Sequence, residues 1–247
     1  MKYILSCDNI TYRYEGALVL ENISLALPEG GFVSLLGPSG VGKTTLFHIL
    51  SGLAQPDRGR VLLNETDITF IPGRVSYMPQ KDMLFDFYTA LDNVILPLIL
   101  RGISKREATY RANSFFPQFG LAGCQGKYPC QLSGGMRQRA ALLRTCLMDN
   151  PVILLDEPFS ALDAITRYQI HAWVIDIAKS MGLSILFVTH DVEEAITLSD
   201  TVYTLTGRPG RITAVIDIPH TRPRGKDFQS SAAFSSHKRQ VLDAIGL

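Results

Sequence analysis

One stretch of the chain decides the fold: Gly37-Pro38-Ser39-Gly40-Val41-Gly42-Lys43-Thr44-Thr45. It matches the pattern G-x-x-x-x-G-K-S/T and stands between a largely apolar run, residues 32–36, and a segment of helical character, residues 44–53. Glycines let backbone N–H groups turn toward phosphate oxygens because no Cβ is in the way. The N-terminus of the following helix adds a positive potential. The stretch therefore predicts a strand, a phosphate-binding loop and a helix, in that order.

Two side chains of this loop complete the predicted nucleotide site. Lys43 is expected to reach the β- and γ-phosphates of ATP, and the Thr44 hydroxyl is expected to ligate Mg²⁺. The alternative is a glycine-rich turn that is followed by Lys and Thr by chance. The apolar run before the loop and the helical segment after it favour the phosphate site.

A second motif, residues 152–157, supplies two carboxylates. Its four apolar residues, Val152-Ile153-Leu154-Leu155, predict a buried strand, and Asp156 and Glu157 follow directly. Such a strand delivers the two acids to the carboxyl edge of the sheet, where α/β proteins bind their ligands. Asp156 is expected to hold Mg²⁺, and Glu157 to polarise the attacking water as a general base. Two acids after a strand are often a solvated turn or a helix cap, but the phosphate loop upstream favours the catalytic interpretation.

Apolar and helical segments alternate along the rest of the chain. Short strands are expected at 4–5, 11–14, 23–27, 31–36, 61–63, 75–78, 152–155 and 185–188. Helices are expected at 44–53, 105–116, 135–148 and 164–181 and from 192 onward. This alternation predicts an α/β fold with a parallel sheet.

Bulk composition excludes several classes of function. Lys plus Arg number 24 against 23 Asp plus Glu, so charge gives no reason to expect nucleic-acid binding. The cysteines, Cys7, Cys124, Cys130 and Cys146, have no metal-binding spacing and are expected to be reduced thiols. The longest apolar runs fall far short of the ~20 residues that cross a bilayer, and the N-terminus lacks the pattern of a secretion signal.

A second anion site stands between the two motifs, at Leu132-Ser133-Gly134-Gly135-Met136. A hydroxyl, two glycine amides and a helix start can bind phosphate. The segment resembles the signature motif of ABC-type ATPases, with Met136 where glutamine is common. One ATP cannot occupy two such sites in one chain. The resemblance implies that the signature of one subunit closes over the ATP held by its partner, in a symmetric head-to-tail dimer.

Further motifs extend this resemblance over residues 3 to about 206. Gln80 resembles the glutamine that senses Mg²⁺ and the attacking water. Asp163 resembles the aspartate that reaches across the dimer, and His190 resembles the histidine that contacts the γ-phosphate. Tyr14 resembles the aromatic platform for adenine, with Tyr12 as its competitor and strand packing as the alternative for either tyrosine.

The resemblance also implies an organisation for the whole chain. Residues 1–247 are expected to form one ABC ATPase domain with a P-loop NTPase core. A RecA-like core with an N-terminal antiparallel β subdomain takes up about 1–80 and 150–206. An inserted α-helical subdomain takes up about 85–148, and a short C-terminal tail takes up 207–247.

The branch of the family is indicated by what the chain contains after Thr206. The segments 207–212, 216–219 and 222–224 resemble the nitrate/sulfonate/taurine importer group, which includes importers of thiamine-pyrimidine precursors. A basic turn on a solvated surface is the alternative for this run. The resemblance implies a homodimer that uses ATP and Mg²⁺ and lies peripherally on the cytoplasmic face of the cell membrane. Its implied partners are permease subunits and a solute-binding protein, with no nucleic acid.

Two other functions stay open for such a chain. One is the ATPase of an exporter or of a lipid- or lipoprotein-release system. The other is a catalytically idle regulatory cassette, which the presence of Lys43, Asp156, Glu157 and His190 argues against.

An apolar and aromatic cluster follows Gln80 directly. It consists of Met83, Leu84, Phe85, Phe87, Tyr88, Leu91 and Val94. In the family this junction receives a short cytoplasmic helix of the permease, so we expect an exposed docking groove here. For any one of these side chains, packing inside the helical subdomain is an equally good interpretation.

Overall fold

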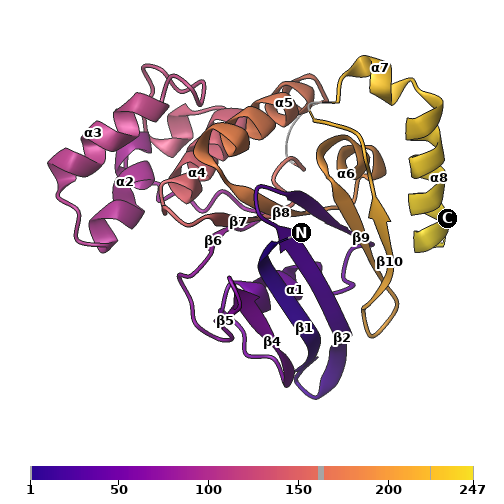
Figure 1. The fold of residues 1–247 in the computed structure, drawn as a ribbon. Helices are drawn as coiled ribbons and strands as arrows, with labels where there is room; N and C mark the ends of the chain where they lie inside the picture. The colour runs from indigo at the N-terminus through magenta and orange to yellow at the C-terminus, as the bar shows by residue number, and fades with distance from the viewer. Residues whose placement is uncertain (1, 161–163, 223, 247) are drawn as a thin grey trace.

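The computed structural model describes residues 2–160, 164–222 and 224–246. The structure has two β-sheets: one lies among the helices in the middle of the view, and the other forms the lower part of the molecule (Figure 1). The sheet near the N-terminus has the strand order β2-β1-β4-β5 and is antiparallel. Its strands are β1 Tyr3–Tyr14, β2 Ala17–Pro28, β4 Arg58–Leu63 and β5 Thr66–Asp67.

The first two strands are longer than the sequence pattern indicated. Sequence reasoning placed separate short strands at 4–5 and 11–14, whereas β1 runs through both. Asn9 on β1 and Asn22 on β2 both have a φ of 51°, and both lie where the register between the strands shifts. Asparagine tolerates this left-handed conformation at a bulge. The two bulges interrupt the alternation of apolar and polar residues, so the pattern breaks although the strand continues.

The larger sheet has the order β10-β9-β3-β8-β7-β6. All neighbouring strands in it are parallel except β9 and β10, which confirms the predicted α/β fold with a parallel sheet. Its strands are β3 Phe32–Leu36, β6 Ser76–Met78, β7 Val152–Asp156, β8 Ser184–Thr189, β9 Thr201–Thr206 and β10 Arg211–Asp217.

The central strands are buried on both faces. Alternate residues of β7 belong to two different hydrophobic cores: Ile153 and Leu155 face one, Val152 and Leu154 the other. One core includes α1, Lys43–Leu50, and the antiparallel sheet. The other includes α5, Ala164–Met181, and the helical subdomain. Burial on both faces explains why these strands are continuous apolar runs in the sequence.

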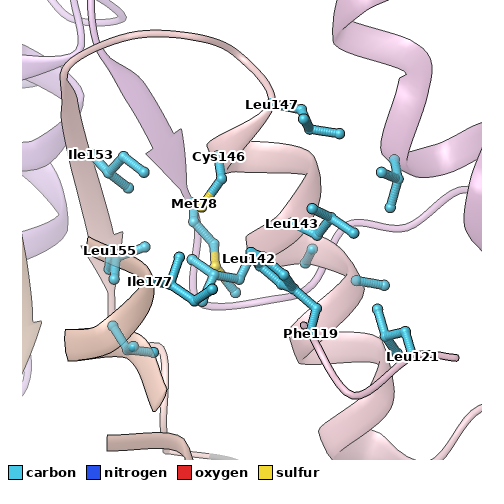
Figure 2. Close-up of a cluster of buried hydrophobic side chains, with 14 of the residues drawn as sticks. Met78, Phe119, Leu121, Leu142, Leu143, Cys146, Leu147, Ile153, Leu155 and Ile177 are labelled. Carbon is cyan, nitrogen blue, oxygen red and sulfur yellow. The ribbon is translucent and has the colours of Figure 1, made fainter. Parts of the chain in front are cut away.

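Helix α4, Gly134–Cys146, joins the helical subdomain to the larger sheet. Figure 2 shows Leu142, Leu143 and Cys146 of α4 among side chains from both sides, with Met78 from the sheet and Phe119 from the subdomain. The other helices of this subdomain are α2, Ala90–Leu100, and α3, Lys105–Phe115, and a 3₁₀ turn spans Pro129–Gln131. The start of α4 is therefore held on a packed support that reaches both the sheet and the subdomain.

The chain after Thr206 is folded, although sequence reasoning identified no element there. β10 extends the larger sheet, and it is followed by α7, Lys226–Gln229, and α8, Ala232–Ile245. Helix α8 packs against α6, Val192–Leu198, through Phe234 and Val241. Buried Arg224 donates hydrogen bonds to the carbonyls of Ile196 and Ile218. β10 lacked a clear sequence signal because it is an edge strand whose residues are mostly exposed.

No helix within 2–160, 164–222 and 224–246 combines the length and the apolar character that crossing a bilayer requires.

Candidate nucleotide-binding and catalytic site

The predicted site residues follow the carboxyl ends of three adjacent strands. Gly37 comes directly after β3, Glu157 directly after β7, and His190 directly after β8. These strands are neighbours in the order β3-β8-β7 and run parallel. Their carboxyl ends therefore bring residues from distant parts of the sequence to one edge, where open α/β sheets bind ligands.

The phosphate loop has the backbone that its glycines predict. Gly40 and Gly42 have φ values of 78° and 109°, which side chains rarely allow. At Gly42 a Cβ would lie 2.8 Å from Cδ2 of Leu20, so the close approach also requires glycine. Val41 is buried in the core and anchors the loop, whereas Pro38, Ser39 and Gly40 are exposed. The loop is thus fixed at its base and open to solvent at its rim.

Lys43 is buried and lies over its own loop. Its ammonium donates to the carbonyl oxygens of Gly37 at 2.8 Å and Pro38 at 2.9 Å. Burial lowers the pKa of Lys43, while the negative charges of Glu157 and Asp156 oppose that shift. A further anion beside this ammonium would stabilise its charged form, which is what a phosphate-binding lysine requires.

Asp156 and Thr44 meet in the same place. The Thr44 hydroxyl donates to Oδ2 of Asp156 at 2.8 Å, and the Tyr77 hydroxyl donates to the same oxygen at 3.4 Å. Burial raises the pKa of Asp156, and the bond from Thr44 opposes that shift. A carboxylate beside a threonine hydroxyl is a hard oxygen donor set, which suits Mg²⁺. The pair predicted from sequence therefore fits a magnesium ion.

Two polar side chains contact the same carboxylate oxygen of Glu157. Nε2 of Gln80 donates to Oε2 of Glu157 at 2.9 Å, and Nδ1 of His190 lies 3.4 Å from that oxygen. Glu157 has a φ of 46°, a left-handed conformation that is unusual for a residue with a side chain. Its backbone N–H donates to the carbonyl of Val188 at 3.1 Å, which ties this conformation to β8. The structure thus brings Glu157, Gln80 and His190 together as a cluster beside Asp156.

The second anion site is formed at the start of α4. The hydroxyl of Ser133 accepts from the N–H of Met136 at 3.3 Å and caps the helix. Ser133 and Gly134 are exposed, and a Cβ at Gly134 would meet nothing within 4 Å. The start of this helix is therefore exposed, with open space beside Gly134, as expected for a surface that receives a ligand from another molecule.

The two candidate tyrosines differ in their surroundings. Tyr12 packs against the core beneath the antiparallel sheet, whereas Tyr14 is 60% exposed near the end of β1. Packing therefore accounts for Tyr12, whereas the ring of Tyr14 is accessible to a ligand. The role of Tyr14 as a platform for adenine stays a prediction. Asp163 lies outside the described residues.

Known proteins resemble this chain in sequence and in structure. The model of the ABC transporter family matches residues 20–160. The chain belongs to the ABC transporter family. The formylaminopyrimidine import ATP-binding protein ThiZ of Halalkalibacterium halodurans is 39% identical over 220 residues, which are 89% of this chain and 86% of that protein.

Two other proteins extend the comparison. The aliphatic sulfonates import ATP-binding protein SsuB 1 of Rhodococcus jostii is 42% identical over 241 residues, 98% of this chain and 93% of that protein. A dimeric ATP-binding cassette in a post-hydrolysis state, bound to ADP and phosphate, superimposes with a TM-score of 0.76 at 29% identity. That comparison covers 88% of this chain and all of the cassette. The chain is thus an ATP-binding subunit of the ABC type, and it hydrolyses ATP.

The segment after Gln80 in this ABC subunit separates into buried and exposed side chains. Val94 is buried, and Leu84 and Leu91 pack partly against the core. The exposed members are Met83, Phe85, Phe87 and Tyr88. Phe87 is 71% exposed, and its ring lies 4.8 Å from the ring of Tyr88. These four side chains, called the aromatic patch below, form the part of the predicted groove that faces solvent.

The aromatic patch is fixed to the helical subdomain from behind. Buried Asn93 accepts from the N–H of Phe85 at 2.7 Å and donates to its carbonyl at 3.1 Å. Arg144 of α4 donates to the carbonyls of Met83 and Asp82. Sequence reasoning missed Arg144, Asn93 and Tyr77. Their partners are distant in the sequence or are backbone atoms, so no motif marks them.

Proposed function

We propose that this subunit drives a membrane importer as a head-to-tail homodimer, coupling ATP binding and hydrolysis to the uptake of a small solute. One observation supports the dimer: the two anion sites predicted from sequence stand at the starts of two different helices. The phosphate loop opens at α1, and the Ser133 site opens at α4. In a head-to-tail dimer, the Ser133 site of each chain would face the phosphate loop of its partner, and one ATP would contact both sites.

Import is favoured by the relatives. ThiZ and SsuB 1 are named as import ATP-binding proteins, for formylaminopyrimidine and for aliphatic sulfonates. We therefore infer a solute of the nitrate/sulfonate/taurine or pyrimidine-precursor type. The same names favour import over an exporter or a lipid- or lipoprotein-release system.

The proposed chemistry assigns one task to each clustered residue. Lys43 and the amides of residues 37–45 hold the phosphates. Thr44, Asp156 and Gln80 would hold magnesium, which would neutralise charge on the phosphate oxygens. Glu157 takes a proton from the attacking water, and His190 contacts the γ-phosphate. The contacts on Oε2 of Glu157 support this assignment because they hold the base beside both partners.

The proposed organisation follows from the same reading. Residues 1–80 and 150–206 are the RecA-like core with its β subdomain, 85–148 the helical subdomain, and 207–247 a C-terminal extension. Permease subunits dock on the helical subdomain at the cytoplasmic face of the membrane, and a solute-binding protein acts through the permease.

Ser133→Arg is expected to abolish most ATP hydrolysis while ATP still binds near-normally to the monomer. The long cation blocks the partner's γ-phosphate from the Ser133 site, and the phosphate loop of the same chain is untouched. Ser133→Ala is the comparison variant: it removes the helix cap, worth about 0.5–2 kcal/mol of stability, and the hydroxyl of the anion site, but it adds neither bulk nor charge. Steady-state hydrolysis and equilibrium binding of a fluorescent ATP analogue measure the two effects, and normal hydrolysis by Ser133→Arg contradicts the two-site dimer.

Mixing two inactive chains tests the shared site directly. A heterodimer of Ser133→Arg with Lys43→Ala has one site with an intact phosphate loop from the first chain and an intact Ser133 from the second. Hydrolysis is therefore expected to reappear on mixing, although each variant alone is nearly inactive. No recovery from two folded, associating variants would count against sites built from both chains.

Phe85→Asp is expected to weaken co-purification with the permease and to reduce transport, while basal ATP hydrolysis stays largely intact. Phe85 is 43% exposed in the aromatic patch, so the new carboxylate is solvated in the free subunit but buried in a docked complex. Permease pull-down and the basal ATPase rate are compared for the same preparation. Tyr110→Asp is the matched control, since Tyr110 is a 78% exposed aromatic residue on α3. Intact pull-down and transport by a folded Phe85→Asp would remove Phe85 from the docking surface, and loss of folding would assign it to the core.

A further inference from the structure

A partly buried histidine lies behind the cluster of Glu157 and His190. His171 is on α5, and its Nε2 lies 2.9 Å from Oε1 of Glu194, near the start of α6. The other oxygen of Glu194 accepts a hydrogen bond from the hydroxyl of Thr189. Thr189 is the residue directly before His190, and both Thr189 and Glu194 are buried. A chain of side-chain contacts thus runs from α5 to the loop that carries His190.

His171 also contacts the loop that carries Glu157. Its ring packs edge-on against Phe159, with the ring centres 4.8 Å apart. Phe159 is fully packed and stands two residues after Glu157. The two loops are therefore joined twice: at the front, where His190 meets Glu157 at 3.4 Å, and at the back, through His171.

We propose that His171 is a positioning residue that holds the His190 loop, through Glu194 and Thr189, at a fixed distance from the Glu157 loop. This inference rests on the proposed catalytic roles of Glu157 and His190.

Because Glu194 is buried, losing its contact with His171 is expected to change the position of the Glu194 side chain. Nε2 of His171 lies within hydrogen-bond distance of this carboxylate, and the tautomer with its proton on Nε2 donates to Oε1 of Glu194. Removing that donor leaves a buried oxygen without a partner, and this costs more than the bond itself contributes. Glu194 then moves toward water or another donor, and the Thr189 hydroxyl that it holds moves with it.

A second contact between α5 and the same loop supports this reading. Arg167 stands one helical turn before His171 on α5, and its Nη1 lies 3.7 Å from Oδ2 of Asp191. Asp191 caps α6 by accepting from the N–H groups of Glu193 and Glu194. One face of α5 therefore contacts Asp191 directly and reaches Thr189 through Glu194.

His171→Leu is expected to lower kcat for ATP hydrolysis by about 10-fold to 100-fold, the effect of misplacing a catalytic group by about 1 Å. The KM and the affinity for a fluorescent ATP analogue are expected to change little, because the phosphate loop is not involved. His171→Gln is expected to recover most of the rate, since an amide nitrogen can replace Nε2 as donor to Glu194. Lys179→Leu, on the exposed side of α5, is the matched control and is expected to hydrolyse ATP like the unmodified chain.

The location of the His190 loop is measured separately from the rate. The ¹³Cε1 resonance of His190 in labelled protein, assigned by its loss in His190→Ala, is expected to shift in His171→Leu and to stay in place in Lys179→Leu. An unchanged kcat with an unshifted resonance in His171→Leu overturns the proposal. A His171→Gln variant as slow as His171→Leu also overturns it, because packing alone then explains the effect. Normal hydrolysis by His190→Ala instead contradicts the proposed role of His190, while the resonance still decides whether His171 positions the loop.

Discussion

Glu157→Gln is expected to bind ATP and magnesium as the unmodified chain does, to hydrolyse ATP ~10²–10⁴-fold more slowly, and to accumulate as a dimer in the presence of Mg-ATP. The loss of rate is the usual effect of removing a positioned general base. The amide has the shape of the carboxylate, so Gln80 can still donate to its oxygen. Asp156 and Thr44, which carry the proposed magnesium contacts, are unchanged.

The dimer follows from the same substitution. If ATP lies between two chains, hydrolysis is the step that releases them, and a chain that cannot hydrolyse ATP keeps its partner. Size-exclusion chromatography with and without Mg-ATP measures this association, and steady-state hydrolysis measures the rate.

A nearby carboxylate provides the control for Glu157→Gln. Glu193 is also close to the His190 loop, but it is exposed and pairs with Lys238. Glu193→Gln removes the same charge and is expected to leave both the rate and the association unchanged. A Glu157→Gln protein that stays monomeric with Mg-ATP and fully active would contradict the role of Glu157 as general base and the ATP site shared between two chains.

The fold was predictable where the sequence pattern follows directly from burial. β3, β7 and β8 are buried on both faces, so they stand out as continuous apolar runs, and the helix expected at 164–181 has the same bounds as α5. The pattern was less informative at the edges. Asn9 and Asn22 interrupt β1 and β2 at bulges, and β10 is an exposed edge strand that needs β9 to form.

The candidate site was predictable to the extent that its residues stand in motifs. Lys43, Asp156, Glu157, Gln80 and His190 follow strands or loops with recognisable spacing, and the structure places them together. The contact between His171 and Glu194 has no such signal, because a single histidine on a helix is more often a packed residue. Only the packing of α5 against α6 brings the two side chains within 2.9 Å.

Lys43→Ala is expected to lose tight ATP binding, with the dissociation constant raised at least about 10-fold. Lys43 is the one residue of the stretch 37–45 with a charged side chain, and its ammonium lies within hydrogen-bond reach of two carbonyls of that loop. A hydrogen bond that involves a charged group contributes about 1.5–3 kcal/mol. Since about 1.4 kcal/mol corresponds to a factor of ten in affinity, the loss of even one such bond to a phosphate reaches this value. Titration with a fluorescent ATP analogue measures the affinity.

Two comparisons separate the charge of Lys43 from its packing. Lys43 is only 6% exposed, so alanine also removes buried methylene groups and both contacts to the loop. Lys43→Met keeps most of that volume without the charge, and it is expected to bind ATP as weakly as Lys43→Ala if the ammonium is what holds the phosphates. Lys179→Ala, an exposed position on α5, controls for the loss of one positive charge from the whole chain. Burial lowers the pKa of Lys43 and so disfavours its charged form. The negative charge of a bound triphosphate would oppose this effect and stabilise the ammonium. Unchanged affinity in Lys43→Met would therefore place the nucleotide elsewhere and would remove the basis for every role proposed around it.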